Sequence, residues 1–186
     1  MSNLLFIKEG FKKFKSIGSI SKSSRFVAKE MLKNINFNEK IVIVELGAGT
    51  GAITKFLMEK MNEESKLIII ESNEAFCRKL QVGLDHRVIL IQDSAEHIED
   101  HIKNLNLGMV DYVVSSLPFV MFNEHLCIRI LNSVSRVMKP DALLIQLHYS
   151  LWIKKIYEKI FCKIKINFVP VNIPPAFIFI CSKNKV

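Results

Sequence analysis

The sequence predicts an α/β fold with a doubly wound, mostly parallel sheet. From residue 41 onward, short apolar segments rich in isoleucine and valine alternate with amphipathic ones. Nearly continuous apolar strands are typical of parallel sheets whose two faces are both covered. A glycine-rich turn directly follows the first apolar segment, as at the strand–helix junctions of such sheets. Together these observations indicate one sheet with helices on both sides.

The individual elements follow from the same alternation. We expect strands at residues 41–46, 66–72, 87–93, 109–116 and 142–150, with helices between them at 52–61, 73–82, 95–104 and 122–138. Two further β-rich segments, 163–171 and 175–183, are separated by too few residues for a crossover helix. They should therefore pair antiparallel and give a seven-stranded sheet an antiparallel edge, with an antiparallel last strand.

The N-terminal segment is predicted to be distinct from the rest of a single globular domain. We expect an amphipathic helix and a helical lid in residues 1–34, followed by the main domain in residues 35–186. On a helix, one stripe would carry apolar side chains beside a stripe of lysines, the apolar residues being Leu4, Ile7, Phe11 and Phe14. Such a helix can lie in an anionic membrane interface or pack on the sheet. Residues 151–165 repeat this basic and apolar chemistry, with the same two interpretations.

Charge and cysteine content narrow the class of protein. The formal net charge of +8 favours anionic partners, either nucleic acid or an acidic membrane surface. The four scattered cysteines lack metal-ligand spacing, so we expect reduced thiols, a cytoplasmic location and no metal site. No apolar segment reaches the roughly 18 residues needed to cross a bilayer. Contact with a membrane is therefore expected only at its surface.

The segment "ELGAGTG", residues 45–51, carries the first functional signal. Gly47, Gly49 and Gly51 permit a tight turn and the close approach of a ligand to the backbone. The helix behind them would offer free N–H groups. The same spacing also fits the dinucleotide-binding fingerprint, or a plain strand–helix turn.

Polar residues at four successive strand ends favour a particular family. Glu45, Glu71 and Asp93 lie at the ends of the first three strands, and "SSLPF", residues 115–119, ends the fourth. Ligands bind at the carboxyl ends of strands in open α/β sheets. In these features the chain resembles the class I S-adenosylmethionine-dependent methyltransferases, which have a Rossmann-like fold.

The resemblance implies a set of cofactor-binding residues. The glycine loop would hold the methionine part of S-adenosylmethionine, Glu71 the ribose, and Asp93 with its two successors the adenine. The full set implied in this way is Glu45, Gly47, Ala48, Gly49, Gly51, Glu71, Ser72, Asp93, Ser94, Ala95 and Ser115.

Two groups of methyltransferases compete for the function. The ribosomal RNA adenine dimethyltransferases carry an Asn-Leu-Pro-Tyr type motif, where this chain has Ser116-Leu117-Pro118-Phe119. Serine cannot supply both the amide donor and the carbonyl acceptor that asparagine offers. The chain resembles the bacterial phospholipid N-methyltransferases in more places: residues 17–31, the Ser-x-Leu-Pro motif, Gln146 to Tyr149, and "NIPPA" at 172–176.

That second resemblance implies an enzyme that methylates the amine of phosphatidylethanolamine or a related aminolipid. The implied partners are the aminophospholipid and an anionic membrane surface, and we expect a monomer at the inner face of the cell membrane. The alternatives left open are a nucleic-acid adenine methyltransferase, a small-molecule amine methyltransferase and a non-catalytic cofactor-binding module.

Candidate acceptor-site residues follow from the same motifs. Four residues are expected to hold the amine, namely Ser116, Leu117, Pro118 and Tyr149. The aromatic faces of Phe119 and Tyr149 would attract a methylammonium group. His148 should face away from Tyr149, as a packed or a surface histidine and not a catalyst, and His97 and His101 show no partner in the sequence. The lid and substrate contacts would come from Ser19, Ser21, Ser24, Arg25, Phe119, Pro174 and Pro175.

Overall fold

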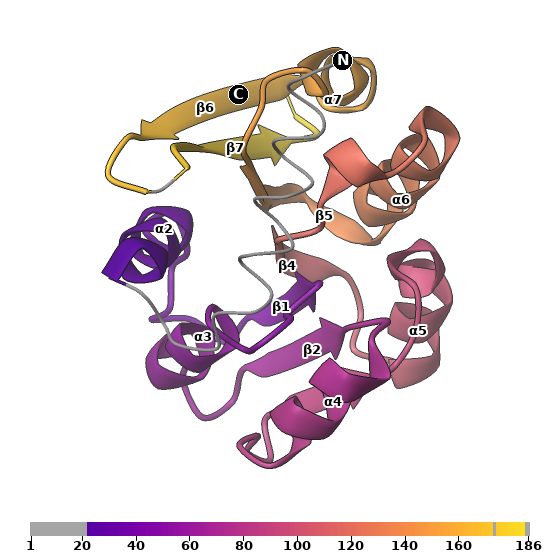
Figure 1. Ribbon diagram of the computed structural model, residues 1–186. Helices are drawn as coiled ribbons and strands as arrows, with labels where there is room; N and C mark the ends of the chain where they lie inside the picture. Colours follow the sequence, from indigo (N-terminus) through magenta and orange to yellow (C-terminus); the bar gives the residue numbers. More distant parts are fainter. Residues whose placement is uncertain (1–21, 173, 185–186) are drawn as a thin grey trace.

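The sheet has seven strands flanked by helices on both faces (Figure 1). The computed structural model describes residues 22–172 and 174–184, with side chains from residue 25 onward. The strands are β1 (Val42–Leu46), β2 (Lys66–Ile70), β3 (Val88–Ile91), β4 (Val110–Ser115), β5 (Met138–His148), β6 (Lys163–Val169) and β7 (Ala176–Ser182). The helices are α2 (Lys22–Leu32), α3 (Thr54–Lys60), α4 (Glu74–Gln81), α5 (Ile98–Leu105), α6 (Glu124–Val137) and α7 (Lys154–Ile160), with 3₁₀ turns η1 (Ala95–His97) and η2 (Phe119–Met121).

Strand order confirms the predicted doubly wound sheet. The order is β3-β2-β1-β4-β5-β7-β6, and β1 to β5 pair in parallel. β7 pairs antiparallel with both β5 and β6, so the predicted antiparallel pairing of the last two strands is confirmed. The antiparallel strand does not form the edge, however. The connection through α7 places β6 one strand away from β5, and the returning strand β7 fills the gap.

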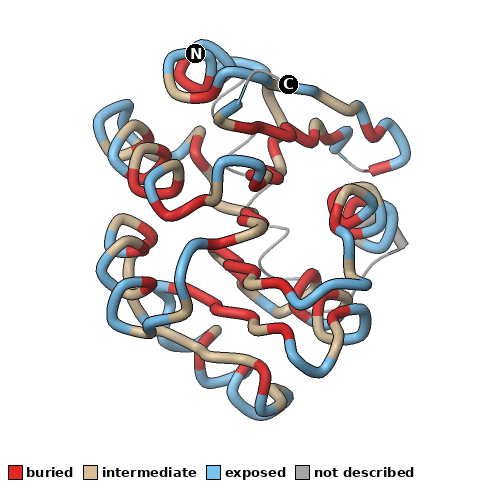
Figure 2. The backbone as a smooth tube through the Cα atoms, turned by 180° about the vertical axis from the view of Figure 1, so that it is seen from behind, coloured by how far each residue is buried: buried red, intermediate tan, exposed pale blue. Residues whose placement is uncertain are grey.

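Two layers of helices cover the alternating faces of the strands. On β1, Ile43 faces the core beneath α2, α3 and α4, whereas Val44 faces the core beneath α5, α6 and α7. Both faces are buried, which explains why the strands are nearly continuously apolar. Buried residues run through the central strands, and exposed residues lie on the outer sides of the helices (Figure 2).

Helix α2 is packed into this core. It buries one apolar face against the β5, β6 and β7 part of the sheet, through Val27, Ala28, Met31 and Leu32. Asn167 on β6 also donates a hydrogen bond to Glu30 at 2.8 Å. The described part of the N-terminal segment is thus anchored to the domain. The predicted helix at residues 1–14 lies outside the described residues.

Parallel pairing brings the functional segments to one edge of the sheet. The carboxyl ends of β1 to β5 lie together there, and β6 runs in the same direction because it is antiparallel to β7. We call this the carboxyl edge, made of the loops that follow these strands. α2 reaches this edge through Glu30, whose partner Asn167 lies near the carboxyl end of β6. Over the residues described, no helix is long and apolar enough to cross a bilayer.

Candidate active site at the carboxyl edge

The glycine loop after β1 has the conformation that its glycines permit. Gly47, Gly49 and Gly51 have φ of 71°, 57° and 80°, in the left-handed region. A Cβ atom on Gly47 would lie 2.8 Å from Cδ2 of Leu117, so the loop packs directly against the segment after β4. At Gly49, by contrast, a Cβ atom would have no heavy atom within 4 Å. The loop therefore packs tightly at its first glycine and is open at its second, as a loop that receives a ligand requires.

Glu71, at the end of β2, is tied to this loop. Its carboxylate accepts hydrogen bonds from the backbone N–H of Gly49 and of Asn73, both at 2.9 Å. The side chain is buried, yet a carboxylate offers about four acceptor positions, so capacity remains for hydroxyl groups. Its neighbour Ser72 is exposed. The structure thus brings together the glycine loop and the acid predicted to bind the ribose.

Glu45 is the acid buried beneath the loop. It is 2% exposed, and its Oε2 accepts a hydrogen bond of 2.7 Å from the hydroxyl of Thr54 at the start of α3. Burial raises the pKa of Glu45 to about 7, against the opposing effect of the Thr54 hydrogen bond. A cation bound nearby would favour the ionised form. S-adenosylmethionine carries two positive groups, and this buried carboxylate fits such a ligand.

Asp93 follows β3 and accepts more hydrogen bonds than the sequence indicated. Its carboxylate accepts from the backbone N–H of Ser94 at 2.7 Å, from Nδ1 of His97 at 3.0 Å and from Nε2 of His101 at 2.7 Å. These hydrogen bonds, with that of Ser94 the largest effect, lower the pKa of Asp93 to about 2. His97 and His101, for which the sequence analysis found no partner signal, thus share Asp93 as their partner. The spacing of four residues from Asp93 to His97 and on to His101 was the available signal.

The segment after β4 is held from several sides. The hydroxyl of Ser115 accepts the N–H of Leu117 at 3.3 Å, and the Leu117 carbonyl accepts from Phe119 N at 2.9 Å and from Gln146 Nε2 at 3.1 Å. Pro118, with φ −80° and ψ 68°, forms an inverse γ-turn between them. The Pro118 carbonyl also accepts the N–H of Met121 at 2.8 Å.

This geometry corrects one expectation about the acceptor site. A carbonyl oxygen has two lone pairs, and both lone pairs of Leu117 are already used within the fold. The sequence analysis expected Leu117 to help hold the amine. Its carbonyl has no free lone pair to accept a hydrogen bond from an incoming amine. Ser116 remains as the polar side chain of the motif, and its backbone N–H donates to Leu46 at 3.0 Å.

Phe119 also departs from its expected role. The ring is 1% exposed and packs among Phe122, His148 and Tyr157, with centroid distances of 5.8, 6.0 and 6.2 Å. The turn at Pro118 and the 3₁₀ turn η2 direct the side chain into the core. An aromatic ring in this position is not available to stack on a substrate.

His148 and Tyr149 lie on opposite faces of β5, as the strand period predicts. His148 is buried, with Nε2 3.1 Å from the hydroxyl of Tyr157, and burial lowers its pKa to about 3. Of the two predicted alternatives, a packed or a surface histidine, the structure shows the packed one. Tyr149 packs beside the core under α2, and burial raises its pKa while a hydrogen bond with Asn172 opposes the rise. Asn172 in turn donates to the Pro174 carbonyl at 2.6 Å, which connects β5 to the exposed Pro174-Pro175 turn.

Of the predicted lid residues, Ser19 and Ser21 lie outside the described residues, as does the side chain of Ser24. Arg25 is exposed in the first turn of α2. Of the remaining cofactor candidates, Ala48, Ala95 and Ser115 are buried within this edge.

Gln146 was noted in the sequence as part of a motif, but no site role was predicted for its side chain. It is fully buried in β5, where Nε2 donates to the carbonyls of Leu117 and Leu147 at 3.1 and 2.8 Å. Its Oε1 is buried and has no hydrogen-bond partner within the described part of the chain. A buried acceptor without a partner costs folding stability. The presence of glutamine at this position is therefore better explained by the hydrogen bond from Nε2 that supports the Leu117 segment.

We expect Gln146→Leu to slow methyl transfer by about 10- to 100-fold, because the Leu117 segment loses a support and shifts relative to the glycine loop. Cofactor affinity should remain near that of the unaltered protein. Initial rates, together with calorimetric titration of the cofactor, separate the two effects. The exposed Gln81→Leu on α4 is the matched control. An unchanged rate in Gln146→Leu would contradict this role.

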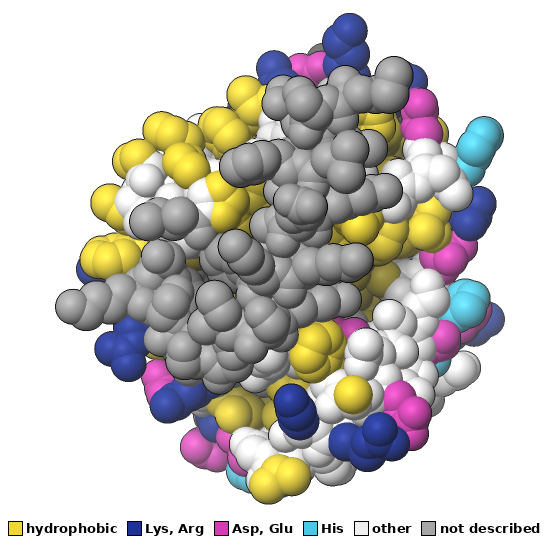
Figure 3. Space-filling view, viewed as in Figure 1, with side chains coloured by type: hydrophobic (Ala, Val, Ile, Leu, Met, Phe, Trp, Pro, Cys, Tyr) yellow, Lys and Arg dark blue, Asp and Glu magenta, His cyan; other side chains and the backbone are white. Residues whose placement is uncertain are grey.

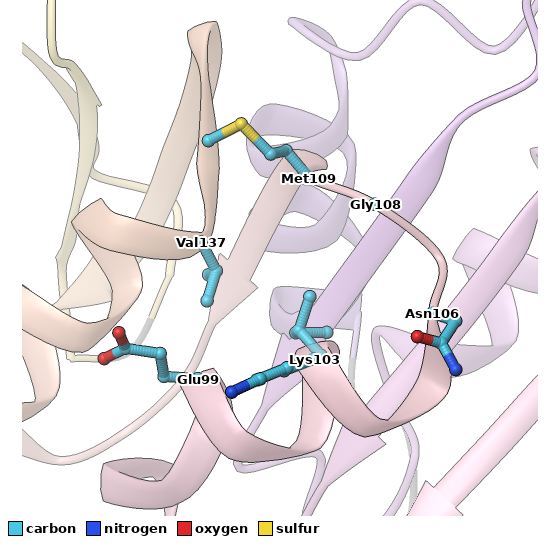
Figure 4. Close-up of a pocket in the computed structure, with 7 residues that line it drawn as sticks. Glu99, Lys103, Asn106, Gly108, Met109 and Val137 are labelled. Atoms are coloured by element: carbon cyan, nitrogen blue, oxygen red, sulfur yellow. The ribbon is translucent and has the colours of Figure 1, made fainter.

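A further hollow in the described residues lies away from this site. A cavity of about 400 Å³ opens between the end of α5, the end of α6 and the residues that enter β4 (Figure 4). Its lining is Glu99, Ile102, Lys103, Asn106, Gly108, Met109 and Val137. Because most of these residues precede β4 or lie toward the ends of α5 and α6, the cavity is at the opposite edge of the sheet from the glycine loop. It does not belong to the candidate active site.

Comparison with known proteins agrees with this geometry. The family described as Ribosomal RNA adenine dimethylase matches residues 10–149. The chain is 28% identical over 180 residues to an ornithine lipid N-methyltransferase of Singulisphaera acidiphila, covering 95% of this chain and 94% of that protein. It is 25% identical to ribosomal RNA small subunit methyltransferase A of a Hydrogenobaculum species, over 67% of this chain and 46% of that protein.

Solved structures share the fold. A SAM-dependent methyltransferase from Aquifex aeolicus superposes with a TM-score of 0.69 at 20% identity, covering 93% of this chain and 98% of that one. Magnesium protoporphyrin IX methyltransferase from Synechocystis PCC 6803, solved with SAM bound, has a TM-score of 0.64 at 12% identity, covering 88% and 79%. These likenesses concern the architecture.

Proposed function

This chain belongs to the ribosomal RNA adenine dimethylase family of S-adenosylmethionine-dependent methyltransferases, and from that membership we propose that it methylates the amine of an aminolipid at a membrane surface. The observation that carries the proposal is the geometry of the segment after β4. That segment lacks the groups that would hold a flat adenine base, and it offers one hydroxyl to an amine.

An adenine acceptor makes demands that this site does not meet. In the motif typical of the RNA enzymes, an asparagine side chain and the backbone hold the amino group while an aromatic ring stacks on the base. Here serine stands at the asparagine position, the Leu117 carbonyl is already occupied, and the Phe119 ring is buried. A neutral alkyl amine needs only one hydrogen-bond acceptor and no stacking surface. The Ser116 hydroxyl can be that acceptor.

The relatives favour the same acceptor. The ornithine lipid N-methyltransferase aligns over nearly the whole of both chains, whereas the RNA methyltransferase aligns with less than half of its own length. Ornithine lipid and phosphatidylethanolamine share a primary amine on a headgroup. The proposal therefore names an aminolipid, and the choice between these two headgroups is decided by the assay.

The rim around the site supports access from a membrane. Exposed apolar side chains follow β4, β5 and β6, lie near the carboxyl end of β6, or lie in the first half of α2, namely Phe26, Met121, Leu151, Trp152, Phe168 and Val171. Figure 3 shows hydrophobic side chains gathered over the β6–β7 end of the molecule. Lys155, at the start of α7 after β5, and Arg25, in the first turn of α2, are both exposed. Apolar side chains flanked by cations suit an anionic lipid interface, so we include peripheral binding to such a membrane in the proposal.

The chemistry asks this chain for alignment more than for acid–base catalysis. When bound, S-adenosylmethionine supplies a methyl group activated by the sulfonium sulfur. A neutral amine that received this methyl group would gain a carbon–nitrogen bond in place of the cofactor's carbon–sulfur bond, and the resulting ammonium would release a proton to solvent. Ser116 would accept a hydrogen bond from the amine and direct its lone pair. His148 takes no part, because it is buried on the other face of β5.

The test is methyl transfer from labelled S-adenosylmethionine to defined acceptors. Vesicles with phosphatidylethanolamine, vesicles with ornithine lipid and ribosomal RNA are incubated separately with the protein. We expect label in the lipid extract of at least one vesicle sample, and a reduced rate for Ser116→Ala. Labelled RNA with unlabelled lipid would overturn the proposal, and Ser133→Ala, at a buried serine of α6, is the matched control.

A further inference from the structure

The side chains around Asp93 form a cluster that extends the cofactor site. His97 ends the 3₁₀ turn η1 and His101 lies one helical turn further on in α5. Both rings turn back to the carboxylate of Asp93, with nitrogen–oxygen distances of 3.0 and 2.7 Å to Oδ2. Nothing in a plain strand–helix connection requires two histidines to bond the same carboxylate.

Charge determines which ring nitrogens carry hydrogen. Ionised Asp93 only accepts hydrogen bonds, so Nδ1 of His97 and Nε2 of His101 must both be donors. Ser94 N–H is a third donor, at 2.7 Å to Oδ1. Nδ1 of His97 lies 3.1 Å from Oδ1 as well, so its single hydrogen is shared between the two oxygens. A carboxylate has about four acceptor positions, and three donor hydrogens leave capacity for one more from a ligand.

The cluster is held in place and remains partly open. Arg129 on α6 donates to Glu96 of η1 at 2.8 Å, which ties the turn that carries His97 to the neighbouring helix. About a third of the Asp93 side chain, 34%, is exposed. Within the described ranges, no group of three histidine, cysteine, aspartate or glutamate side chains is arranged to hold a metal ion. Around Asp93, the two imidazoles bond the carboxylate itself.

We propose that His97 and His101 are positioning residues that aim the free acceptor position of Asp93 at the exocyclic amino group of the cofactor's adenine. Asp93 lies at the end of β3, two strands from the glycine loop and one from Glu71. The histidines touch neither cofactor nor substrate. They restrict the rotation of the carboxylate, so that its acceptor is already oriented when the cofactor arrives. This inference is independent of the methyl acceptor.

The experiment compares two ligands on several variants. One ligand is S-adenosylhomocysteine, and the other is its analogue in which hydrogen replaces the exocyclic amino group. Calorimetric titration gives the affinity ratio of the two ligands for the unaltered protein, His97→Ala, His101→Ala and the double variant. His101→Gln and His97→Asn each return a nitrogen donor near the original position. His86→Ala, an exposed histidine at the other end of β3, is the matched control.

We expect the alanine variants to weaken S-adenosylhomocysteine binding by about tenfold, equivalent to about 1.4 kcal/mol, and to leave the analogue unchanged. The affinity ratio should return toward its original value in His101→Gln and His97→Asn. Equal weakening of both ligands would indicate a merely structural role and overturn the proposal, as would an unchanged ratio in folded variants. The conservative variants keep the test decisive if an alanine variant fails to fold.

Discussion

Gly47→Ala is expected to reduce methyl transfer by about 100-fold or more, because it disturbs both the cofactor loop and the acceptor segment. A residue with a Cβ atom at φ 71° costs about 1–2 kcal/mol of folding free energy. The new methyl would also lie 2.8 Å from Cδ2 of Leu117, which must then move. Leu117 is held by Ser115 and Gln146, so the displacement is passed to the segment that carries Ser116.

The measurement is the initial rate with labelled cofactor, alongside the unfolding free energy from urea titration. Gly83→Ala serves as the control, because Gly83 has neither a positive φ nor an atom within 4 Å of a new Cβ. It should leave the rate unchanged. If Gly47→Ala transferred methyl groups as fast as Gly83→Ala, the close contact between the two loops would have no functional meaning.

Glu45→Gln is expected to change folding stability and cofactor affinity in opposite directions. The pKa of Glu45 is raised by burial from 4.5 to about 7 in the folded protein. Its contribution to stability is therefore present below pH 4.5 and is lost as the pH rises through 7. Above pH 7 the buried charge costs up to about 3 kcal/mol, which the neutral amide avoids. The variant should thus unfold at higher urea concentration than the unaltered protein at pH 8, and at a similar concentration at pH 5.

Cofactor affinity should fall in Glu45→Gln, whereas folding stability rises. A cationic cofactor favours the carboxylate, so the affinity of the unaltered protein should rise with pH up to about 7 and then level off. Glu45→Gln should bind about 10- to 100-fold more weakly at pH 8, with little dependence on pH. Calorimetric titration across this range checks both statements. The exposed Glu59→Gln on α3 is the control, and a pH-dependent affinity that persists in Glu45→Gln would assign the titration to another group.

The sheet and the cofactor loop could be predicted because their signals are local. Strands buried on both faces must be apolar at nearly every position, and β1 to β5 are recognisable for that reason. The acids Glu45, Glu71 and Asp93 were located by their place after strands, which parallel pairing brings to one edge. The position of β7 between β5 and β6 was beyond reach, because it depends on the route of the chain through α7.

The orientation of single side chains was less accessible. Whether Phe119 faces a substrate or the core depends on the turn at Pro118 and on partners from β5 and α7. Gln146 bonds Leu117 across 29 positions of sequence, a contact that no local pattern indicates. His97 and His101 were the exception, since their spacing from Asp93 fits one face of a helix and the partnership could have been anticipated.

The most direct test of the proposed function is a competition in one vessel. The protein receives labelled S-adenosylmethionine, ribosomal RNA, and vesicles that contain both ornithine lipid and phosphatidylethanolamine in an anionic background. After the reaction, lipid and RNA are separated and the label in each is counted. We predict that the label is recovered in an aminolipid whose amine has gained methyl groups, and that it is reduced by Gly47→Ala. Label recovered in the RNA, with none in either lipid, would contradict the account.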